Sequence, residues 1–230
     1  MTSCVWTQKY VSLDSPLLYT KKNESQISLR GWVQSMNEYN YQRQVIAYHG
    51  CDRPVADKVL LESLALAPSE KKHDWLGKGI YFWEHGPQRA FDWAVQRQNM
   101  GKISEPAVVG AFIQLGNCFD LLDTRYTEAL HRMWPFFVEA RVADAKSIPA
   151  NRSSQQNPEI NKLLRYRDCA VINWTLAQLE ESEPAYDSVR GVFQEDEPVY
   201  DGSEIRLKSH IQIAIRNPAC IIGYFRPSYV

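Results

Sequence analysis

The sequence of 230 residues predicts an α+β fold, and three observations support this class. Apolar runs of strand length recur in the first half of the chain, at residues 45–50, 80–83 and 107–115. Segments with helical spacing lie between and after these runs. Near the C-terminus, residues 210–216 alternate between the two faces of a strand. Strands wrapped by helices indicate an α+β domain.

The chain is expected to divide into a short lead-in and one main domain. Residues 1–43 carry turn signals and only short apolar pieces, so we expect a small lead-in with one helix or edge strand. Residues 44–230 form the main domain, with a helical insertion at about 124–182. An apolar fraction of 44% is enough for a sizeable core.

The segment from Trp75 onward predicts a glycine turn, a short buried strand and a helix. Two glycines one residue apart precede the apolar run Ile-Tyr-Phe-Trp. Pro87 suits the first turn of a helix, where its missing N–H costs nothing. Ala90, Trp93 and Ala94 then recur with the spacing of one helix face.

This arrangement favours a ligand-binding role, because a glycine has no Cβ and lets a ligand approach the backbone. Tyr81 and Trp93 would offer flat surfaces to such a ligand. The alternative is a packed strand and helix whose aromatic side chains belong to the core. A second apolar strand upstream ends in His49-Gly50, and this favours the ligand-binding interpretation.

Helical spacing also predicts a helix over residues 55–67. Its apolar face is expected to consist of Val55, Val59, Leu60, Leu64 and Ala67. Residues 107–115 predict a buried strand that ends at Gly116, and a turn with a short strand follows at 117–123.

A helix is expected from Thr124 to about residue 145, where Pro135 should kink or interrupt it. A loop at residues 148–157 separates it from a second helix, which begins at Pro158 and continues to Glu181.

The last part of the chain predicts β-structure. Strands are expected at residues 186–193, 210–216 and 220–225, and an acidic loop at 195–198. One face of the middle strand carries Ile211, Ile213 and Ile215, and the other carries His210, Gln212, Ala214 and Arg216.

The charge balance argues against binding of nucleic acid over the whole surface, without excluding a nucleic-acid substrate held by a local patch. A net charge of −1 and a pI near 6.5 give no global attraction to nucleic acid. One local basic group could bind a pyrophosphate or a nucleic-acid backbone, and a solvated helix surface is the alternative. This group consists of Arg152, Lys162, Arg165 and Arg167.

Five scattered cysteines favour reduced thiols and no metal site, since none has zinc-ligand spacing. The start of the chain lacks a basic segment followed by an apolar run, so we expect no signal peptide. Apolar segments all fall short of the roughly 20 residues that span a bilayer. A soluble, cytoplasmic protein without a membrane partner is therefore expected.

Two motifs together resemble the ADP-ribosyltransferases of the poly(ADP-ribose) polymerase and diphtheria-toxin type. The first is the strand end Tyr-His49-Gly50. The second is Gly-Lys-Gly-Ile-Tyr-Phe at residues 77–82, followed by a helix with Ala90 and Trp93. The resemblance covers about residues 44–100 and a third segment near the C-terminus. It implies two split sheets around a cleft that binds NAD as a substrate, and a catalytic domain made of the main domain.

The resemblance also implies roles for single residues. His49 would hydrogen-bond the adenosine-side ribose, and the backbone N–H and C=O of Gly50 would pair with the nicotinamide carboxamide. Tyr81 would stack on the nicotinamide ring, where a cation over an aromatic face gains roughly 0.5–2 kcal/mol. Trp93 would close the stack, with a core aromatic of the helix as the alternative.

The sequence departs from the family at its third position, which is usually a glutamate. The late strand places Gln212 there, with His210 two residues earlier on the same face. The glutamate binds the nicotinamide-side ribose and stabilises the positive charge that develops as nicotinamide leaves. An amide can orient the ribose but brings no charge. Either the amide suffices, or a carboxylate comes from Glu195, Asp196 or Glu197, for which a solvated acidic turn is the alternative.

By this resemblance, we expect a mono-ADP-ribosyltransferase that cleaves NAD at the nicotinamide–ribose bond and transfers ADP-ribose to a protein, RNA or DNA acceptor. The family analogy also suggests a toxin-like effector that an antitoxin protein neutralises. Two alternatives stay open. One is an NAD glycohydrolase, with water as the acceptor, and the other is a module that binds NAD or ADP-ribose without turnover.

Overall fold

The computed structural model describes residues 43–153 and 164–228. The predicted lead-in, apart from Arg43, lies outside the described residues. The predicted helix start at Pro158 and the basic residue Lys162 also lie outside them.

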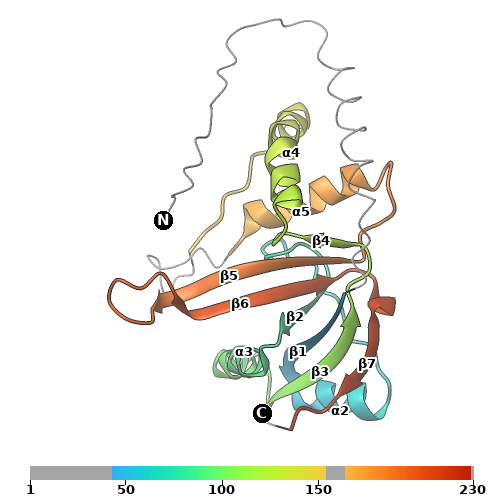
Figure 1. Cartoon of the computed structure of the whole chain (residues 1–230), viewed down its shortest axis with the longest axis vertical. Helices are drawn as coiled ribbons and strands as arrows, with labels where there is room; N and C mark the ends of the chain where they lie inside the picture. Colours follow the sequence, from blue (N-terminus) through green and yellow to red (C-terminus); the bar gives the residue numbers. More distant parts are fainter. Residues whose placement is uncertain (1–42, 154–163, 229–230) are drawn as a thin grey trace, which may run out of the picture.

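Seven strands of the described chain form one sheet, in the order β4-β5-β6-β2-β1-β3-β7 (Figure 1). Neighbouring strands are antiparallel except β4 and β5, which are parallel. The strands are β1 (Gln44–Asp52), β2 (Ile80–Glu84), β3 (Pro106–Gln114), β4 (Cys118–Asp120), β5 (Ser188–Pro198), β6 (Arg206–Ile215) and β7 (Ile221–Phe225). The helices are α2 (Arg53–Leu61), α3 (Pro87–Asn99), α4 (Thr124–Ala143) and α5 (Tyr166–Leu179), with a 3₁₀ helix η2 (Pro218–Cys220). A mixed sheet with these helices is compatible with the predicted α+β class.

The sheet is continuous, whereas two sheets were expected. β2 pairs with β6 on one side and with β1 on the other, so the ladder runs from β4 to β7. The pairing with β6 covers all of β2, from Ile80 to Glu84. The pairing with β1 consists of only two residue pairs, Ala47 with Glu84 and Tyr48 with Trp83. The two halves of the sheet are therefore joined at β1 and β2 by only two residue pairs, and we call this short ladder the seam.

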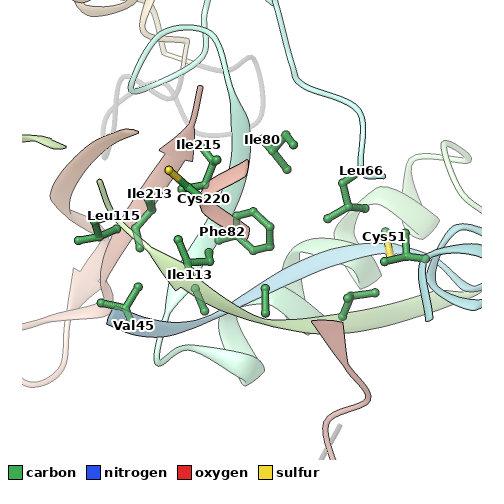
Figure 2. Close-up of a cluster of buried hydrophobic side chains, with 14 of the residues drawn as sticks. Val45, Cys51, Leu66, Ile80, Phe82, Ile113, Leu115, Ile213, Ile215 and Cys220 are labelled. Carbon is green, nitrogen blue, oxygen red and sulfur yellow. The ribbon is translucent and has the colours of Figure 1, made fainter. Parts of the chain in front are cut away.

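One face of the sheet, which we call the α2 face, carries the largest apolar core (Figure 2). On this face, Phe82 of β2 lies opposite Ile213 of β6, and both side chains are fully buried. Val59 of α2 joins the same core cluster. The alternation predicted for the late strand places its isoleucines on this face.

The opposite face, which we call the α3–α5 face, is covered by helices at its two ends. At one end, Ala90 of α3 packs with Trp83 and Val108. At the other end, α4 and α5 pack over β4, β5 and the Ala214 position of β6. Gln212 lies opposite Trp83 on this face, between the two covered parts.

Helix α2 is shorter than predicted, and its buried face differs. The chain leaves the helix before Ser63, which has a left-handed φ of 58°. Leu64 therefore lies beyond the helix and is exposed, and Val55 is exposed as well. Ala56 and Val59 form the buried face instead.

Helix α4 is continuous through Pro135, so of the two predicted effects, a kink or an interruption, the interruption is wrong. A proline removes one backbone hydrogen bond inside a helix. Met133 and Phe137, on either side of Pro135, are buried, and their packing offsets this loss. The following helix, α5, ends at Leu179, before the predicted end at Glu181.

The acidic segment that was predicted as a loop lies within β5. Glu195 pairs with Lys208, and Pro198 pairs with Arg206. The ladder is irregular between these pairs, where Asp196 has a φ of 70°. An irregularity of this kind lets a strand continue while it changes the direction of its side chains.

Gly50 is a position in β1 that cannot accept a side chain without movement. A Cβ there would lie 2.1 Å from the carbonyl oxygen of Ala90, which belongs to the backbone of α3. We expect Gly50→Ala to lower the free energy of unfolding by about 1–3 kcal/mol, the usual range for overpacking. Urea denaturation measures this loss. Gly223→Ala in β7 is the matched control, because nothing lies within 4 Å of its Cβ. Equal stability of the two variants would show that α3 can move away from β1.

Candidate functional site

Five of the predicted site residues come from three neighbouring strands. β6 carries His210 and Gln212, β2 carries Tyr81, and β1 carries His49 and Gly50. The sheet order β6-β2-β1 places these strands side by side. Gln212 lies opposite Trp83, and Trp83 lies opposite Tyr48. Residues paired directly across strands share a face. This row therefore crosses the α3–α5 face from β6 to β1.

The ladder between β1 and β2 ends beside Gly50. Its last pair is Tyr48–Trp83, although β1 continues beyond this point. The carbonyl of Ile46 accepts a hydrogen bond from the N–H of His85 at 3.0 Å. Even-numbered residues of β1 therefore direct their backbone groups towards β2. The N–H and C=O of Gly50 face β2 at a level where the ladder has already ended.

His49 lies next to Gly50, beyond the last pair of the β1–β2 ladder. Its Nδ1 lies 2.7 Å from the carbonyl oxygen of Tyr81. A carbonyl oxygen can only accept, so Nδ1 donates its proton and Nε2 of the neutral ring is an acceptor. Burial lowers the pKa of His49 despite this hydrogen bond, which favours the neutral ring at pH 7. The ring packs 5.7 Å from Phe82, on the α2 face, so the structure does not place it on the face that carries Gln212.

Tyr81 holds the glycine turn in place. Its hydroxyl donates to the carbonyl of Gly77 at 2.6 Å and accepts from the N–H of Leu76 at 2.8 Å. Burial raises the pKa of Tyr81 well above its usual value, so the hydroxyl stays protonated. Asn173 of α5 accepts from the N–H of Lys78 at 3.0 Å and closes the same turn. The phenol therefore has a structural role besides any stacking role.

The glycine turn approaches protein atoms closely. Gly77 has a left-handed φ of 79°. A Cβ at this position would lie 2.5 Å from the side-chain oxygen of Asn173. The close approach that the sequence suggested for a ligand is made here by α5.

Gln212 and His210 are in direct contact on β6. Their Nε2 atoms are 3.1 Å apart, and the Nδ1 of His210 lies 2.8 Å from the carbonyl oxygen of Lys208. Since that carbonyl only accepts, Nδ1 of His210 donates to it, and Nε2 accepts from the amide of Gln212. The Oε1 of Gln212 then remains as an acceptor for a ligand. Burial lowers the pKa of His210, and Arg89 adds to this, which favours the neutral ring.

Glu195 brings a carboxylate to the same place from β5. Its Oε1 lies 3.6 Å from Nε2 of His210 and 2.7 Å from a terminal nitrogen of Arg89 on α3. The Glu195 side chain is only 10% exposed, so the solvated-turn interpretation is wrong for this residue. Asp196 and Glu197, the other two candidates, are more exposed. The structure therefore joins Gln212, His210 and Glu195 in one cluster.

Aromatic rings and arginines enclose this cluster. Three aromatic rings surround His210. Their centroids lie from its ring centroid at 6.2 Å for Trp75, 6.5 Å for Trp83 and 6.0 Å for Phe193. The guanidinium of Arg89 lies 5.5 Å from the Trp83 ring. The guanidinium of Arg165 lies 4.7 Å from the Trp75 ring. The site is thus a narrow arrangement of flat side chains with cations above two of them.

Trp93 contacts the edge of this arrangement. Its ring lies 5.8 Å from Trp83, and the guanidinium of Arg97 lies 5.3 Å from it. These contacts are typical of a partly buried helix aromatic, and they also keep the ring within reach of the α3–α5 face.

Trp83 and Arg89 belong to the site but were not among the predicted residues. Trp83 follows Tyr81 by two positions in a strand, so alternation could have placed both on one face. Arg89 lies in the first turn of α3, and no pattern in the sequence distinguishes it from a solvated helix residue.

Three of the four predicted basic residues lie in the described part of the chain, and their guanidinium groups stack on different aromatic rings. Arg165 reaches the site through Trp75. Arg152 stacks on Tyr166, and Arg167 stacks on Trp134.

Comparisons with known proteins give one short match. No family model and no solved structure matches the chain. An uncharacterized protein of Methanocaldococcus jannaschii is 48% identical over 46 residues. The matched segment spans 20% of this chain and 21% of that protein, so it shows similarity of a segment only.

Within residues 43–153 and 164–228, no helix is long and apolar enough to cross a membrane. The same residues contain no group of three or more His, Cys, Asp or Glu side chains that could hold a metal ion.

Proposed function

We propose that the protein is an ADP-ribosyltransferase that breaks the nicotinamide–ribose bond of NAD and transfers ADP-ribose to a macromolecular acceptor. The observation that carries the proposal is the seam on β1 and β2. The β1–β2 ladder ends beside Gly50, and Gln212 and Glu195 lie on the α3–α5 face of the same sheet. The two motifs that resemble this family lie on or next to β1 and β2, the strands that form this seam.

The nicotinamide end of NAD would bind at the backbone of Gly50, where the β1–β2 ladder has ended. A carboxamide offers one donor and one acceptor, and the N–H and C=O of a strand residue offer the complementary pair. Such a ligand would continue the ladder where β2 has separated from β1. The pyridinium ring would then lie along the α3–α5 face, near Tyr81 and Trp83, where an aromatic face attracts a cation.

By the family resemblance, His49 and Gln212 would bind the two riboses of NAD. The His49 ring lies on the α2 side of the sheet, so its Nε2 would accept a hydroxyl of the adenosine-side ribose only from a ligand that reaches past the end of the β1–β2 ladder. Oε1 of Gln212 would accept a hydroxyl of the nicotinamide-side ribose. His210 has a positioning role, because its Nε2 binds the amide nitrogen of Gln212 and so turns the amide oxygen towards the ligand.

The reaction needs stabilisation of a developing positive charge. When the C–N bond breaks, its electron pair leaves with nicotinamide, and the ribose becomes oxocarbenium-like. The carboxylate of Glu195 supplies the negative charge that Gln212 lacks. A nucleophile of the acceptor then forms the new bond to the ribose carbon and loses its proton.

Incubation with NAD labelled on the adenosine side tests the proposal. We expect nicotinamide release and transfer of the label to a product of cell extract that protease or nuclease digests. Gln212→Ala should lower nicotinamide release about tenfold, the equivalent of one hydrogen bond to the transition state. Gln194→Ala is the matched control, because this glutamine is exposed on the neighbouring strand and should leave the rate unchanged.

The outcomes separate the candidate functions. Nicotinamide release without label transfer would favour an NAD glycohydrolase. Binding of ADP-ribose without release would favour a binding module. If the protein binds no NAD or ADP-ribose and releases no nicotinamide, the proposal is contradicted.

A further inference from the structure

Unpaired hydrogen-bond donors gather around the α3–α5 face. Six buried side-chain polar atoms in the described residues lack a hydrogen-bond partner. Four of the six are N–H donors beside this face, and they belong to Trp83, Arg89, Arg97 and Arg165. Buried donors in folded proteins nearly always have a partner, so unpaired donors that lie next to each other indicate a ligand or ordered water.

Two of these donors are neighbours at the cluster of Gln212, His210 and Glu195. The Trp83 residue is 5% exposed, and its indole N–H has no partner. The guanidinium of Arg89 lies 5.5 Å from the same ring, and its Nε–H also has no partner. The first turn of α3, which carries Arg89, contains no acidic residue. The positive end of this helix is therefore not compensated by its own side chains.

We propose that Arg89 and the indole N–H of Trp83 form a subsite for the diphosphate of the dinucleotide. The identity of the dinucleotide rests on the proposed function. A diphosphate carries two negative charges and several oxygens, and a guanidinium binds such groups through two parallel hydrogen bonds. The unpaired Nε of Arg89 and the unpaired indole N–H are donors of the kind that these oxygens need.

The subsite has a consequence for Glu195. Arg89 is bound to this carboxylate at 2.7 Å, so a diphosphate and Glu195 compete for one guanidinium. The diphosphate replaces the carboxylate, and Glu195 is released beside His210 and Gln212. Binding of the substrate thus exposes the carboxylate that the reaction uses.

Titration calorimetry with ADP-ribose tests the subsite, since ADP-ribose has the diphosphate but no nicotinamide to release. Arg89→Gln should weaken binding by about 10- to 100-fold, as expected for a lost charged hydrogen bond. Trp83→Phe keeps the ring, removes the N–H and should weaken binding by about threefold to tenfold. Arg97→Gln is the matched control, because Arg97 lies on the same helix, over a tryptophan and with an unpaired Nε. Its affinity should change less than about twofold.

The Glu195→Gln variant tests whether the diphosphate and Glu195 compete for Arg89, or whether the diphosphate is only attracted by the positive charge of Arg89. Because this variant frees Arg89, ADP-ribose should bind several-fold more tightly than to the wild-type protein. If Arg89→Gln fails to fold, the double variant Arg89→Gln/Glu195→Gln removes both charges and is compared with Glu195→Gln alone. Inorganic pyrophosphate should compete with ADP-ribose in the wild-type protein.

Unchanged affinity in Arg89→Gln, or weaker binding in Glu195→Gln, would overturn the subsite. Absence of binding of both ADP-ribose and pyrophosphate to the wild-type protein would overturn it as well. If ADP-ribose binds in an Arg89-dependent way but the protein releases no nicotinamide from NAD, the subsite stands and the proposed reaction fails.

Discussion

Replacing Arg190 with methionine is expected to lower the free energy of unfolding by about 3–5 kcal/mol, the usual loss when one member of a buried ion pair is removed. The side chain of Arg190 is 6% exposed and lies between Glu84, at 2.5 Å, and Asp120, at 3.0 Å. Burial acts to lower the pKa of Arg190, but the two carboxylates raise it overall, so the guanidinium stays charged. In the variant, Glu84 loses its cation, and Asp120 keeps only the more distant and half-exposed Arg43, at 3.9 Å.

Urea denaturation of the Arg190→Met variant measures this loss, and two controls isolate its cause. Arg226→Met removes an arginine that is 58% exposed and paired with Asp57, and should cost less than about 1 kcal/mol. A triple variant that adds Glu84→Gln and Asp120→Asn removes the unpaired charges. It should recover most of the stability. A loss below about 1 kcal/mol in Arg190→Met would mean that water solvates the two carboxylates.

Elements with a strong local pattern could be predicted from the sequence. The run Gly79-Ile-Tyr-Phe gives β2, and the proline with helical spacing behind it gives α3. The strand before His49 and the run that becomes β3 are continuous apolar segments, and they also form as expected. In these segments, periodicity and turn residues agree with the tertiary packing.

Elements that depend on distant partners could not be predicted. The acidic segment of β5 has the composition of a loop, but Lys208 and Arg206 of β6 pair with it and extend the strand. Pro135 should break a helix on local grounds, yet the buried side chains around it keep α4 continuous. The short pairing of β1 with β2 joins residues more than 30 positions apart, so no local pattern records it.

The candidate site divides in the same way. Gln212 could be named from the family resemblance, His210 from the alternation of the same strand, and Glu195 from the acidic segment that precedes this strand. Their contact depends on the register of β5 and β6. The ion pair of Arg89 with Glu195 joins residues 106 positions apart, so it was not accessible to reasoning on local spacing.

Glu195→Gln is expected to lower nicotinamide release from NAD by about 10²- to 10³-fold, the usual loss when one positioned electrostatic group is removed from a transition state. Single-turnover kinetics at saturating NAD measure this, since binding should not weaken. Gln212→Glu in the wild-type background should change the rate little, because Glu195 already supplies a carboxylate. In the Glu195→Gln background, the same change returns a carboxylate to the α3–α5 face and should restore part of the rate. A loss below about threefold in Glu195→Gln, or no rescue by Gln212→Glu, would contradict the assignment of the charge to Glu195.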